Sequence, residues 1–284
     1  NFVGAVLLAS DDRTSTHKTI LSDAAGAVLQ KIAELPPASW TTLIQVLNTE
    51  QAEHHLQVFF NNPKVETSVS SLGWTSNLNP TAQPDFLMEV EANLAGDKAN
   101  QDLVRAYHIT LTQAGTTLHH QVVVDLTNNN PANATWGTNY DTYVRFYTEA
   151  GATNLKLSDG TAVGNQWWPL QPQDYPDKDV PAGFQIQDGY LQLDHLEAPS
   201  NHYQLIFDYD TTYQPNAQGT YSIYWQKEPG TMADPIDITW QTGGQTYKAS
   251  GDLSVDRSIV LSATTIQLGV GQTSNAQIPG VSFG

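Results

Sequence analysis

Along residues 16–47, apolar positions recur at steps of three and four, which is the spacing of an amphipathic helix, whereas residues 55–60 alternate with a period of two and predict a strand. Residues 16–35 carry one such stripe and end before two consecutive prolines, which stop a helix. A second stripe begins at Trp40, and Asn62 followed by a proline indicates the start of a third, short helix. This pattern predicts a small helical region in the first part of the chain.

From Asp85 onward, apolar and polar positions alternate, which is the period of a half-buried β-strand. The runs 103–111 and 118–126 are joined by a turn that contains Gly115, and they predict an antiparallel hairpin. Further short strands with turn residues between them follow up to residue 261. We therefore expect an α+β fold in which a small helical N-terminal region packs on a mainly antiparallel, β-sandwich-like body.

The same pattern divides the chain into four segments. They are a helical or mixed α+β cap at 1–84, a β-rich domain at 85–190 with a long loop at 159–189, a second β-sheet or β-domain at 191–263, and an apolar, β-prone tail at 264–284.

Charged residues make up only 14% of the chain, whereas Thr, Asn and Gln together number 71 of its 284 residues. Neutral hydroxyl and amide groups must supply much of the solubility, and this composition favours an extracellular β-protein. The absence of cysteine excludes disulfides and thiolate metal sites. A net charge of −17 disfavours nucleic acid and anionic membranes as partners.

The apolar opening run, Asn1 to Ala9, is too short to span a bilayer, which needs roughly 20 residues. It also lacks the basic leader of a signal peptide, and no initiator methionine precedes it. No other segment is long and apolar enough to cross a membrane. We expect a chain processed from a longer membrane-anchored or secreted precursor.

Several short segments carry a resemblance to a known family. In the run 85–98, an aspartate, an aromatic residue and an apolar strand lead to an alanine–asparagine pair, a glycine and a lysine, and Arg105 follows on the next strand. Supporting segments are Leu35-Pro36-Pro37, His55-Leu56, Leu72-Gly73-Trp74, Gly137-Thr138-Asn139, Tyr143-Val144-Arg145 and 226–231.

In this order the segments resemble a bacterial envelope family known only as the domain of unknown function numbered four thousand and twelve. The resemblance covers roughly residues 16–260. It implies the C-terminal, extracytoplasmic portion of a single-pass protein and supplies no chemistry. The family's glycine pair is Ala95-Gly96 here, and its glutamine-proline-glycine is Glu228-Pro229-Gly230, so a shared ligand role of that loop does not carry over.

The predicted loop at 159–189 contains three aspartates, Asp174, Asp177 and Asp179, and oxygen-rich loops can bind calcium. The ligand spacing of an EF-hand is absent, however, so a solvated acidic loop is the preferred interpretation. We therefore assign no cofactor.

The same loop contains Trp167, Trp168 and Tyr175, which could form an aromatic platform for sugars. Aromatic residues in a long loop more often fix it to the core or form a protein interface. A glycan is thus a second-choice partner.

Motifs for catalysis are weak in this sequence. Residues 280–284 match G-x-S-x-G around Ser282, but the helix that this motif requires does not follow in the sequence. Glu89 and Glu91 share one strand face at about 7 Å, a separation that could serve a glycosidase, although a solvated strand face is the preferred interpretation. The paired histidines at 54–55 and 119–120 point to opposite strand faces, so neither pair can chelate a metal.

The tail is apolar at alternating positions. It can complete its own sheet or add a strand to a neighbouring subunit. The residues concerned are Ile266, Leu268, Val270, Ile278, Val281 and Phe283.

These features favour an extracellular bacterial surface protein with a structural or self-assembly role, such as a filament or surface-layer subunit, and without catalysis. The alternatives are a carbohydrate-binding or adhesion module that uses the aromatic loop, and an envelope hydrolase. Lys156 and Lys248 lie in predicted strands and are candidates for isopeptide cross-links. The expected partner is a second copy of the chain.

Overall fold

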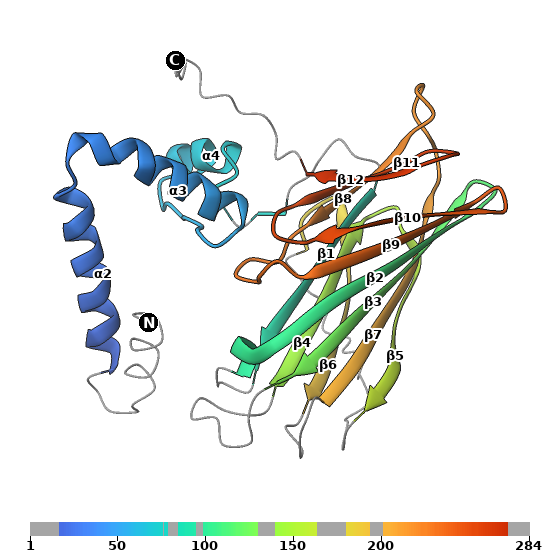
Figure 1. Cartoon of the computed structure of the whole chain (residues 1–284), viewed down its shortest axis with the longest axis horizontal. Coiled ribbons are helices and arrows are strands. Elements are labelled where there is room, and N and C mark those ends of the chain that lie inside the picture. Colours follow the sequence, from blue (N-terminus) through green and yellow to red (C-terminus); the bar gives the residue numbers. More distant parts are fainter. Residues whose placement is uncertain are drawn as a thin grey trace.

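The computed structural model describes residues 17–75, 77–78, 85–94, 99–129, 140–163, 180–193 and 201–271. A group of helices lies beside a body of two β-sheets (Figure 1). The predicted α+β class, with a small helical N-terminal region and a β-sandwich-like body, is confirmed.

The helical region follows the predicted stripes. The strand predicted at 55–60 is wrong, because this segment pairs with no strand in the described chain, and Val58 instead donates its backbone N–H to the Trp74 carbonyl at 2.9 Å. Asn62 caps its last helix, because the Asn62 Oδ1 accepts a hydrogen bond from the Lys64 backbone N–H at 3.0 Å. No helix in the described part of the chain combines the length and the apolar character that a membrane span requires. The elements are α2 (His17–Ala33), the 3₁₀ turn η1 (Pro37–Ser39), α3 (Trp40–Ala52) and α4 (Pro63–Ser71).

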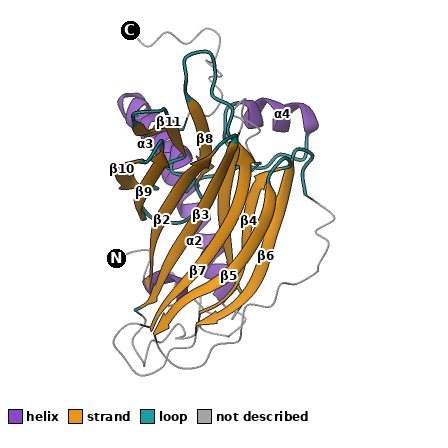
Figure 2. Ribbon diagram, turned by 90° about the vertical axis from the view of Figure 1, so that its right-hand side faces the viewer, coloured by secondary structure: helices purple, strands orange, loops and turns teal. Residues whose placement is uncertain are grey.

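The body contains two six-stranded sheets, which we call sheet A and sheet B. Sheet A has the order β12 (Ile266–Val270), β11 (Arg257–Leu261), β8 (Tyr221–Gln226), β1 (Asp85–Asn93), β4 (Tyr140–Glu149) and β6 (Phe184–Leu193). Sheet B has the order β10 (Gln245–Asp252), β9 (Pro235–Thr242), β2 (Leu103–Ala114), β3 (Thr117–Asn128), β7 (Asn201–Thr212) and β5 (Thr153–Val163). The short turn η2 (Ala99–Asp102) precedes β2. In Figure 2 the strands β2, β3, β7 and β5 lie side by side.

The predicted hairpin is the β2–β3 pair. Its register runs from Leu103 opposite Asn128 to Ala114 opposite Thr117. Gly115 has a φ of 63° in the turn, a conformation that glycine adopts without steric cost.

The two predicted β segments, 85–190 and 191–263, each contribute strands to both sheets. Strand β8 pairs in parallel with β1 in sheet A, and β9 pairs in parallel with β2 in sheet B. Strands from 191–263 therefore extend each sheet that the earlier strands begin, so this segment does not form a sheet of its own. All other strand pairs within the two sheets are antiparallel.

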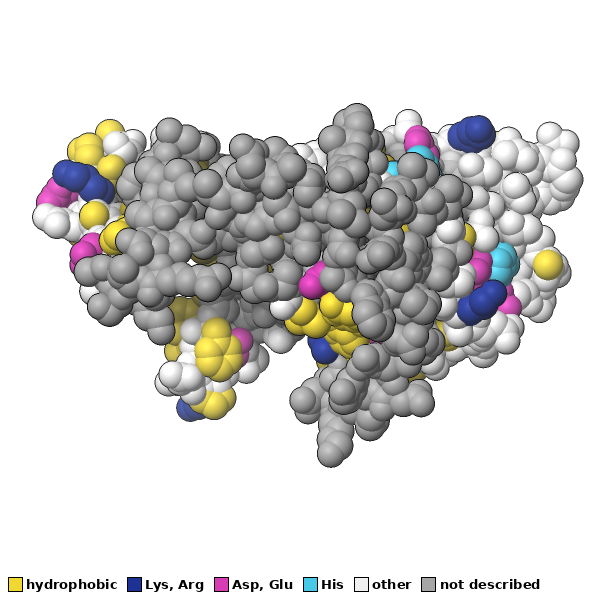
Figure 3. Space-filling model, turned by 90° about the horizontal axis from the view of Figure 1, so that it is seen from below, with side chains coloured by type: hydrophobic (Ala, Val, Ile, Leu, Met, Phe, Trp, Pro, Cys, Tyr) yellow, Lys and Arg dark blue, Asp and Glu magenta, His cyan; other side chains and the backbone are white. Residues whose placement is uncertain are grey.

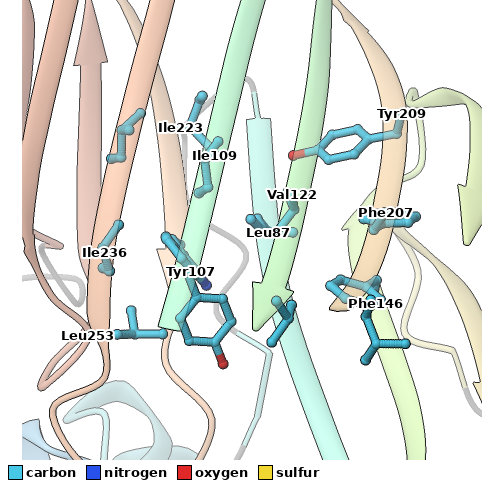
Figure 4. Close-up of a cluster of buried hydrophobic side chains, with 14 of the residues drawn as sticks. Leu87, Tyr107, Ile109, Val122, Phe146, Phe207, Tyr209, Ile223, Ile236 and Leu253 are labelled. Atoms are coloured by element: carbon cyan, nitrogen blue, oxygen red, sulfur yellow. The ribbon is translucent and has the colours of Figure 1, made fainter. Parts of the chain in front are cut away.

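The main core lies between the two sheets, where alternate residues of each strand point inward. Leu87 of sheet A faces residues of sheet B, and the rings of Phe146 and Phe207 stack with centroids 4.5 Å apart (Figure 4). Trp225 and Trp240 are both buried in this core. Association of the sheets therefore rests on burial of large apolar side chains.

The described part of the tail completes its own sheet. Ile266, Leu268 and Val270 belong to β12, which pairs with β11 at the edge of sheet A. The Leu268 side chain lies against Gly251 of β10, where an added Cβ would come within 2.7 Å of it. Strand β12 thus closes one side of the sandwich. The remaining candidate tail residues, Ile278, Val281 and Phe283, lie outside the described residues.

The two candidate cross-linking lysines are placed on the surface. Lys156 on β5 and Lys248 on β10 are both exposed. The isopeptide hypothesis requires a lysine shielded from water, so these two positions do not support it.

Replacement of Phe146 by Ala should lower the free energy of unfolding by about 3–5 kcal/mol, because it leaves a cavity between the sheets. Chemical denaturation monitored by tryptophan fluorescence would measure the loss. Phe59→Ala is the matched control, because this ring is 77% exposed, and it should change the stability by less than about 0.5 kcal/mol. Equal losses in the two variants would contradict this core assignment.

Candidate functional site

The loop that joins β8 to β9, residues 227–234, crosses from sheet A to sheet B and touches the helical region on the way. We call it the β8–β9 loop. All three of its ionisable residues, Lys227, Glu228 and Asp234, are buried. Buried charged groups are costly unless they are paired or hydrogen-bonded. The loop is therefore the first place to look for a function.

The ammonium group of Lys227 is held by three backbone carbonyl groups. Its Nζ donates to the oxygens of Glu53 at 3.0 Å, Glu228 at 3.1 Å and Thr231 at 2.7 Å. Three acceptors satisfy all three N–H donors of a lysine. Burial lowers the pKa of this ammonium. Because Glu53 caps the C-terminus of α3, Lys227 also meets the negative end of that helix.

Asp256, which precedes β11, also contacts the end of α3. We call the contacts of Lys227 and Asp256 with the end of α3 the joint. Asp256 Oδ1 accepts from His54 Nε2 at 2.8 Å and from the Lys227 backbone N–H at 2.8 Å, and its Oδ2 accepts from the Tyr224 hydroxyl. His54 has a φ of 57°, in the left-handed region. Next to it, His55 Nε2 donates to the Thr231 carbonyl at 3.0 Å. The end of α3 is thus fixed to the sandwich by buried polar contacts.

On its other side, the β8–β9 loop borders a buried carboxylate cluster. Glu91 of β1 receives a two-pronged ion pair from Arg105, with Nε to Oε1 at 2.9 Å and Nη2 to Oε2 at 3.1 Å. The Tyr140 hydroxyl also donates to Glu91. Glu89 of β1 accepts from the Tyr107 hydroxyl at 2.9 Å. Both glutamates point into the sandwich, towards residues of β2.

Glu228 and Asp234 complete the cluster. One oxygen of Glu228 accepts from the Glu91 backbone N–H at 2.7 Å. Burial, together with the charge of Glu91, raises the pKa of Glu228 to about 8, and burial raises the pKa of Asp234 to about 6. Burial also raises the pKa of Glu89 well above its usual range. Glu89 Oε1, Glu228 Oε2 and Asp234 Oδ2 are buried without a hydrogen-bond partner in the described part of the chain.

The solvated-face interpretation of Glu89 and Glu91 was wrong, because the side chains of both are buried. The missed signal lies on the next strand, where Arg105 and Tyr107 occupy alternate inward positions and supply partners. Raised carboxyl pKa values suit proton transfer. Among the described residues, burial of these carboxyl groups leaves no path for a substrate.

A second buried polar cluster surrounds Asp85 at the start of β1. Asp85 Oδ2 accepts from the hydroxyls of Thr211 at 3.1 Å and Tyr221 at 3.0 Å, and it lies 3.1 Å from His120 Nε2. Burial and the charge of Asp85 raise the pKa of the nearby Glu149 to about 9. β1 therefore carries polar groups into the sandwich near both of its ends.

The adjacent histidines of β3 face opposite sides, as predicted, whereas His54 and His55 lie in the turn after α3 and not on a strand. His120 is buried beside Asp85, whereas the half-exposed His119 contacts Asp210 through Nδ1 at 2.7 Å. Within the described ranges, no group of three or more His, Asp or Glu side chains could hold a metal ion.

The loop candidates cannot be placed. Asp174, Asp177 and Asp179, the proposed calcium ligands, lie outside the described residues. So do Trp167, Trp168 and Tyr175, the proposed aromatic platform. The structure brings together a different set, the β8–β9 loop with Asp256 and the carboxylate cluster.

No protein-family model matches this chain, and no curated protein matches it either. Among solved structures, one similar chain is described as a putative nutrient binding protein from Legionella pneumophila. It is 9% identical, with a TM-score of 0.35, and the similarity covers 64% of this chain and 72% of that chain. A similarity at this level carries no conclusion about ligand or function.

Replacement of Asp256 by Ala should loosen the helical region, because it leaves His54, the Tyr224 hydroxyl and the Lys227 backbone N–H without their acceptor. We expect a loss of about 3 kcal/mol in the free energy of unfolding. Limited proteolysis should show faster cleavage between the helices and the sandwich. Asp237→Ala is the matched control, with a side chain that is 67% exposed. An unchanged cleavage rate in Asp256→Ala would contradict the joint.

Stability should fall as the pH rises from 5 to 9. Glu228 and Glu149 have folded pKa values of about 8 and about 9, above the value of about 4.3 for an unfolded glutamate. The folded chain therefore holds more protons in this window, and each extra proton costs about 1.4 kcal/mol of stability per pH unit as the pH rises. The stability that protonated Glu228 and Glu149 contribute is fully present below the unfolded pKa. It is lost as the pH rises through the folded pKa values.

Melting temperatures between pH 5 and 9 would measure this dependence. The double variant Glu149→Gln, Glu228→Gln should give a flatter profile, because it removes both titrating groups. The exposed pair Glu34→Gln, Asp237→Asn should keep the original slope. A parallel profile in the buried double variant would show that these carboxyl groups ionise normally in the fold.

Proposed function

We propose that this chain is an extracellular bacterial surface protein with a structural, self-assembling role. The observation that carries the proposal is the uncovered apolar surface of the helical region, which a buried polar joint holds on the sandwich. Contiguous apolar surface on a folded protein marks an interaction site. The cysteine-free, amide-rich composition supports an extracellular location.

The helical region has almost no core of its own. No residue of α3 or α4 is buried. Large hydrophobic side chains instead reach the surface at Val28, Leu29, Trp40, Ile44, Val46, Phe59, Phe60, Val65 and Leu72. This surface needs a partner more than any other described part of the molecule does.

The joint explains how such a surface can serve assembly. The Lys227 and Asp256 contacts fix α3 by buried hydrogen bonds. Asn77 adds a further contact, since its carbonyl oxygen accepts from Gln226 Nε2 at 3.1 Å. A helical region held at a fixed orientation can pass a defined geometry from one subunit to the next.

The resemblance to the envelope family supports the same location. Asp85, Arg105 and Lys227, which lie in its matching segments, are all buried in the polar clusters described above. We propose that these residues maintain the fold of an extracytoplasmic domain and perform no chemistry. The carbohydrate-binding alternative depends on Trp167 and Trp168, and loss of glycan binding in Trp167→Ala, Trp168→Ala would favour it.

Light scattering and electron microscopy of the full chain test self-assembly directly. We expect concentration-dependent oligomers or regular polymers. Ile44→Glu should shift their formation to at least tenfold higher protein concentration, because it buries a charge in the interface. Val104→Glu, at a half-exposed apolar site on sheet B, is the matched control and should assemble normally. A monodisperse monomer at every concentration would overturn the proposed role.

A further inference from the structure

Strand β12 lies at one edge of sheet A. It pairs with β11 on one side, and no strand of the described chain pairs with it on the other side. In an antiparallel pair, residues alternate between those that exchange hydrogen bonds with the partner strand and those whose backbone groups point away from it. The outer side of β12 therefore presents backbone groups that a further strand could bind.

The end of the β11–β12 pair shows which residues point away from β11. Gly271 donates its backbone N–H to the Asp256 carbonyl at 2.7 Å, so every second residue before Gly271 also bonds to β11. The residues whose N–H and C=O point to the outer side are Ile266, Leu268 and Val270. Their spacing is that of a strand, so an extended segment satisfies all of them together.

Both edges of sheet B carry features that oppose the addition of a strand. The pairing of β5 is interrupted by two register shifts, and β10 carries the charged residues Lys248 and Asp252. Bulges and edge charges are common protections against unwanted strand pairing. β12 has neither feature, because its pairing with β11 is continuous and its sequence contains no charge and no proline.

Hydrophobic side chains are rare on the described surface of the sandwich, and in Figure 3 the end opposite the helical region shows mostly neutral polar groups. The exposed large hydrophobic residues of the described sandwich are Leu94, Val104, Met232 and Val270. Of these, only Val270 lies on an edge strand, and it is 63% exposed. Ile266 and Leu268, on the same face of β12, pack on the main core. A strand added here would thus extend the core over Val270.

A second copy of β12 fits this edge when the two strands run antiparallel about Leu268. Ile266 of each chain then lies opposite Val270 of the other, and these apolar cross-strand pairs stabilise the contact. On the outer face, Gln267 lies opposite Gly269, which has no side chain to collide with it. A single register therefore suits the backbone and both faces of the strand.

The faces of the sheet also decide the orientation. Two copies that meet at the same edge in parallel are related by a rotation about the strand direction, which turns one sheet over. The apolar face of one chain would then continue into the polar face of the other. The antiparallel arrangement keeps both apolar faces on the same side.

We propose that β12 of one chain pairs antiparallel with β12 of a second copy, centred on Leu268, so that two A sheets become one continuous sheet. This inference rests on the proposed self-assembly and names one of its contacts. A two-fold contact closes on itself, so it produces pairs of chains. Growth beyond a pair requires a second contact, for which the helical region has uncovered apolar surface.

Val270→Pro tests the hydrogen bonds of the edge. Proline removes an N–H that points away from β11, so the bonds within the chain remain. In sedimentation velocity of the full chain, dimers should form only at about tenfold higher protein concentration, because the contact loses one bond on each side of its axis. Val270→Thr, which keeps the N–H and the branched side chain, is the matched control. Equal association of the two variants would overturn the contact.

Val270→Lys probes the same edge without a change in the backbone. A lysine at an edge strand opposes pairing, so dimer formation should again require about tenfold higher concentration. Val104→Lys is the matched control, because Val104 is 51% exposed on β2, away from the sheet edges. Melting temperatures verify that each variant is folded. Normal association of a folded Val270→Lys variant would contradict the proposal.

Cysteine cross-linking tests the register, because the chain contains no other cysteine. In the proposed pair, position 267 lies opposite position 269 of the second copy, at about 4.5 Å between Cα atoms, which a disulfide spans. Two cysteines at the same position would be about 8 Å apart, which is too far. Gly269 has room for the new side chain, since an added Cβ meets only the Ser258 carbonyl, at 3.8 Å.

Under mild oxidation, a mixture of the Gln267→Cys and Gly269→Cys chains should form covalent dimers at least about tenfold faster than either variant alone. Mass spectrometry should show that each dimer contains one chain of each kind. Equal rates in the mixture and in the single variants would overturn the antiparallel register.

The outcomes separate the two proposals. If the unmodified chain is monomeric at every concentration, both proposals fail. If it assembles and Val270→Pro assembles equally well, β12 is not a contact and self-assembly stands. If Val270→Pro weakens assembly but the mixture does not cross-link preferentially, another extended segment binds the edge, and the pairing of β12 with β12 is overturned.

Discussion

A lysine ammonium that is cut off from water must find acceptors on every side, and at Lys227 these acceptors come from both halves of the molecule. Two carbonyls belong to its own loop and the third belongs to the end of α3. Removal of the helix would leave one N–H of a buried cation unpaired. The sandwich and the helical region are therefore interdependent at the end of α3, where the contact from Asp256 to His54 adds to that from Lys227.

The interior polar groups also define how β1 sits in its sheet. Asp85, Leu87, Glu89 and Glu91 face inward, while Phe86 and Met88 face the other side. A shift of β1 by one residue would turn Phe86 and Met88 inward and the carboxylates outward. The inward hydrogen-bond partners of the carboxylates would then face apolar side chains. Thr211, Tyr107 and Arg105 thus select one register, whereas apolar packing alone would tolerate alternatives.

The elements that depend on local periodicity could be predicted from the sequence. The stripe of α2, the cap at Asn62 and the β2–β3 hairpin with Gly115 are all set by neighbours within a few residues. The candidate site could not be predicted in the same way. The roles of Lys227 and Asp256 depend on Glu53 and His54, which lie far away in the sequence. Glu89 looked solvated for the same reason, since only the facing strand supplies Tyr107.

The two parallel strand pairs have a consequence for the order in which the chain folds. β1 pairs with β8, and β2 pairs with β9. Each partner lies more than a hundred residues later in the sequence. Long loops must close before these pairs form, which slows the last step of folding. Until the chain has been made as far as Thr242, the end of β9, one side of β1 and one side of β2 have no partner strand. A chain built this way keeps the edges of β1 and β2 unpaired until its last third has been made, and unpaired strand edges are where a partly made chain aggregates.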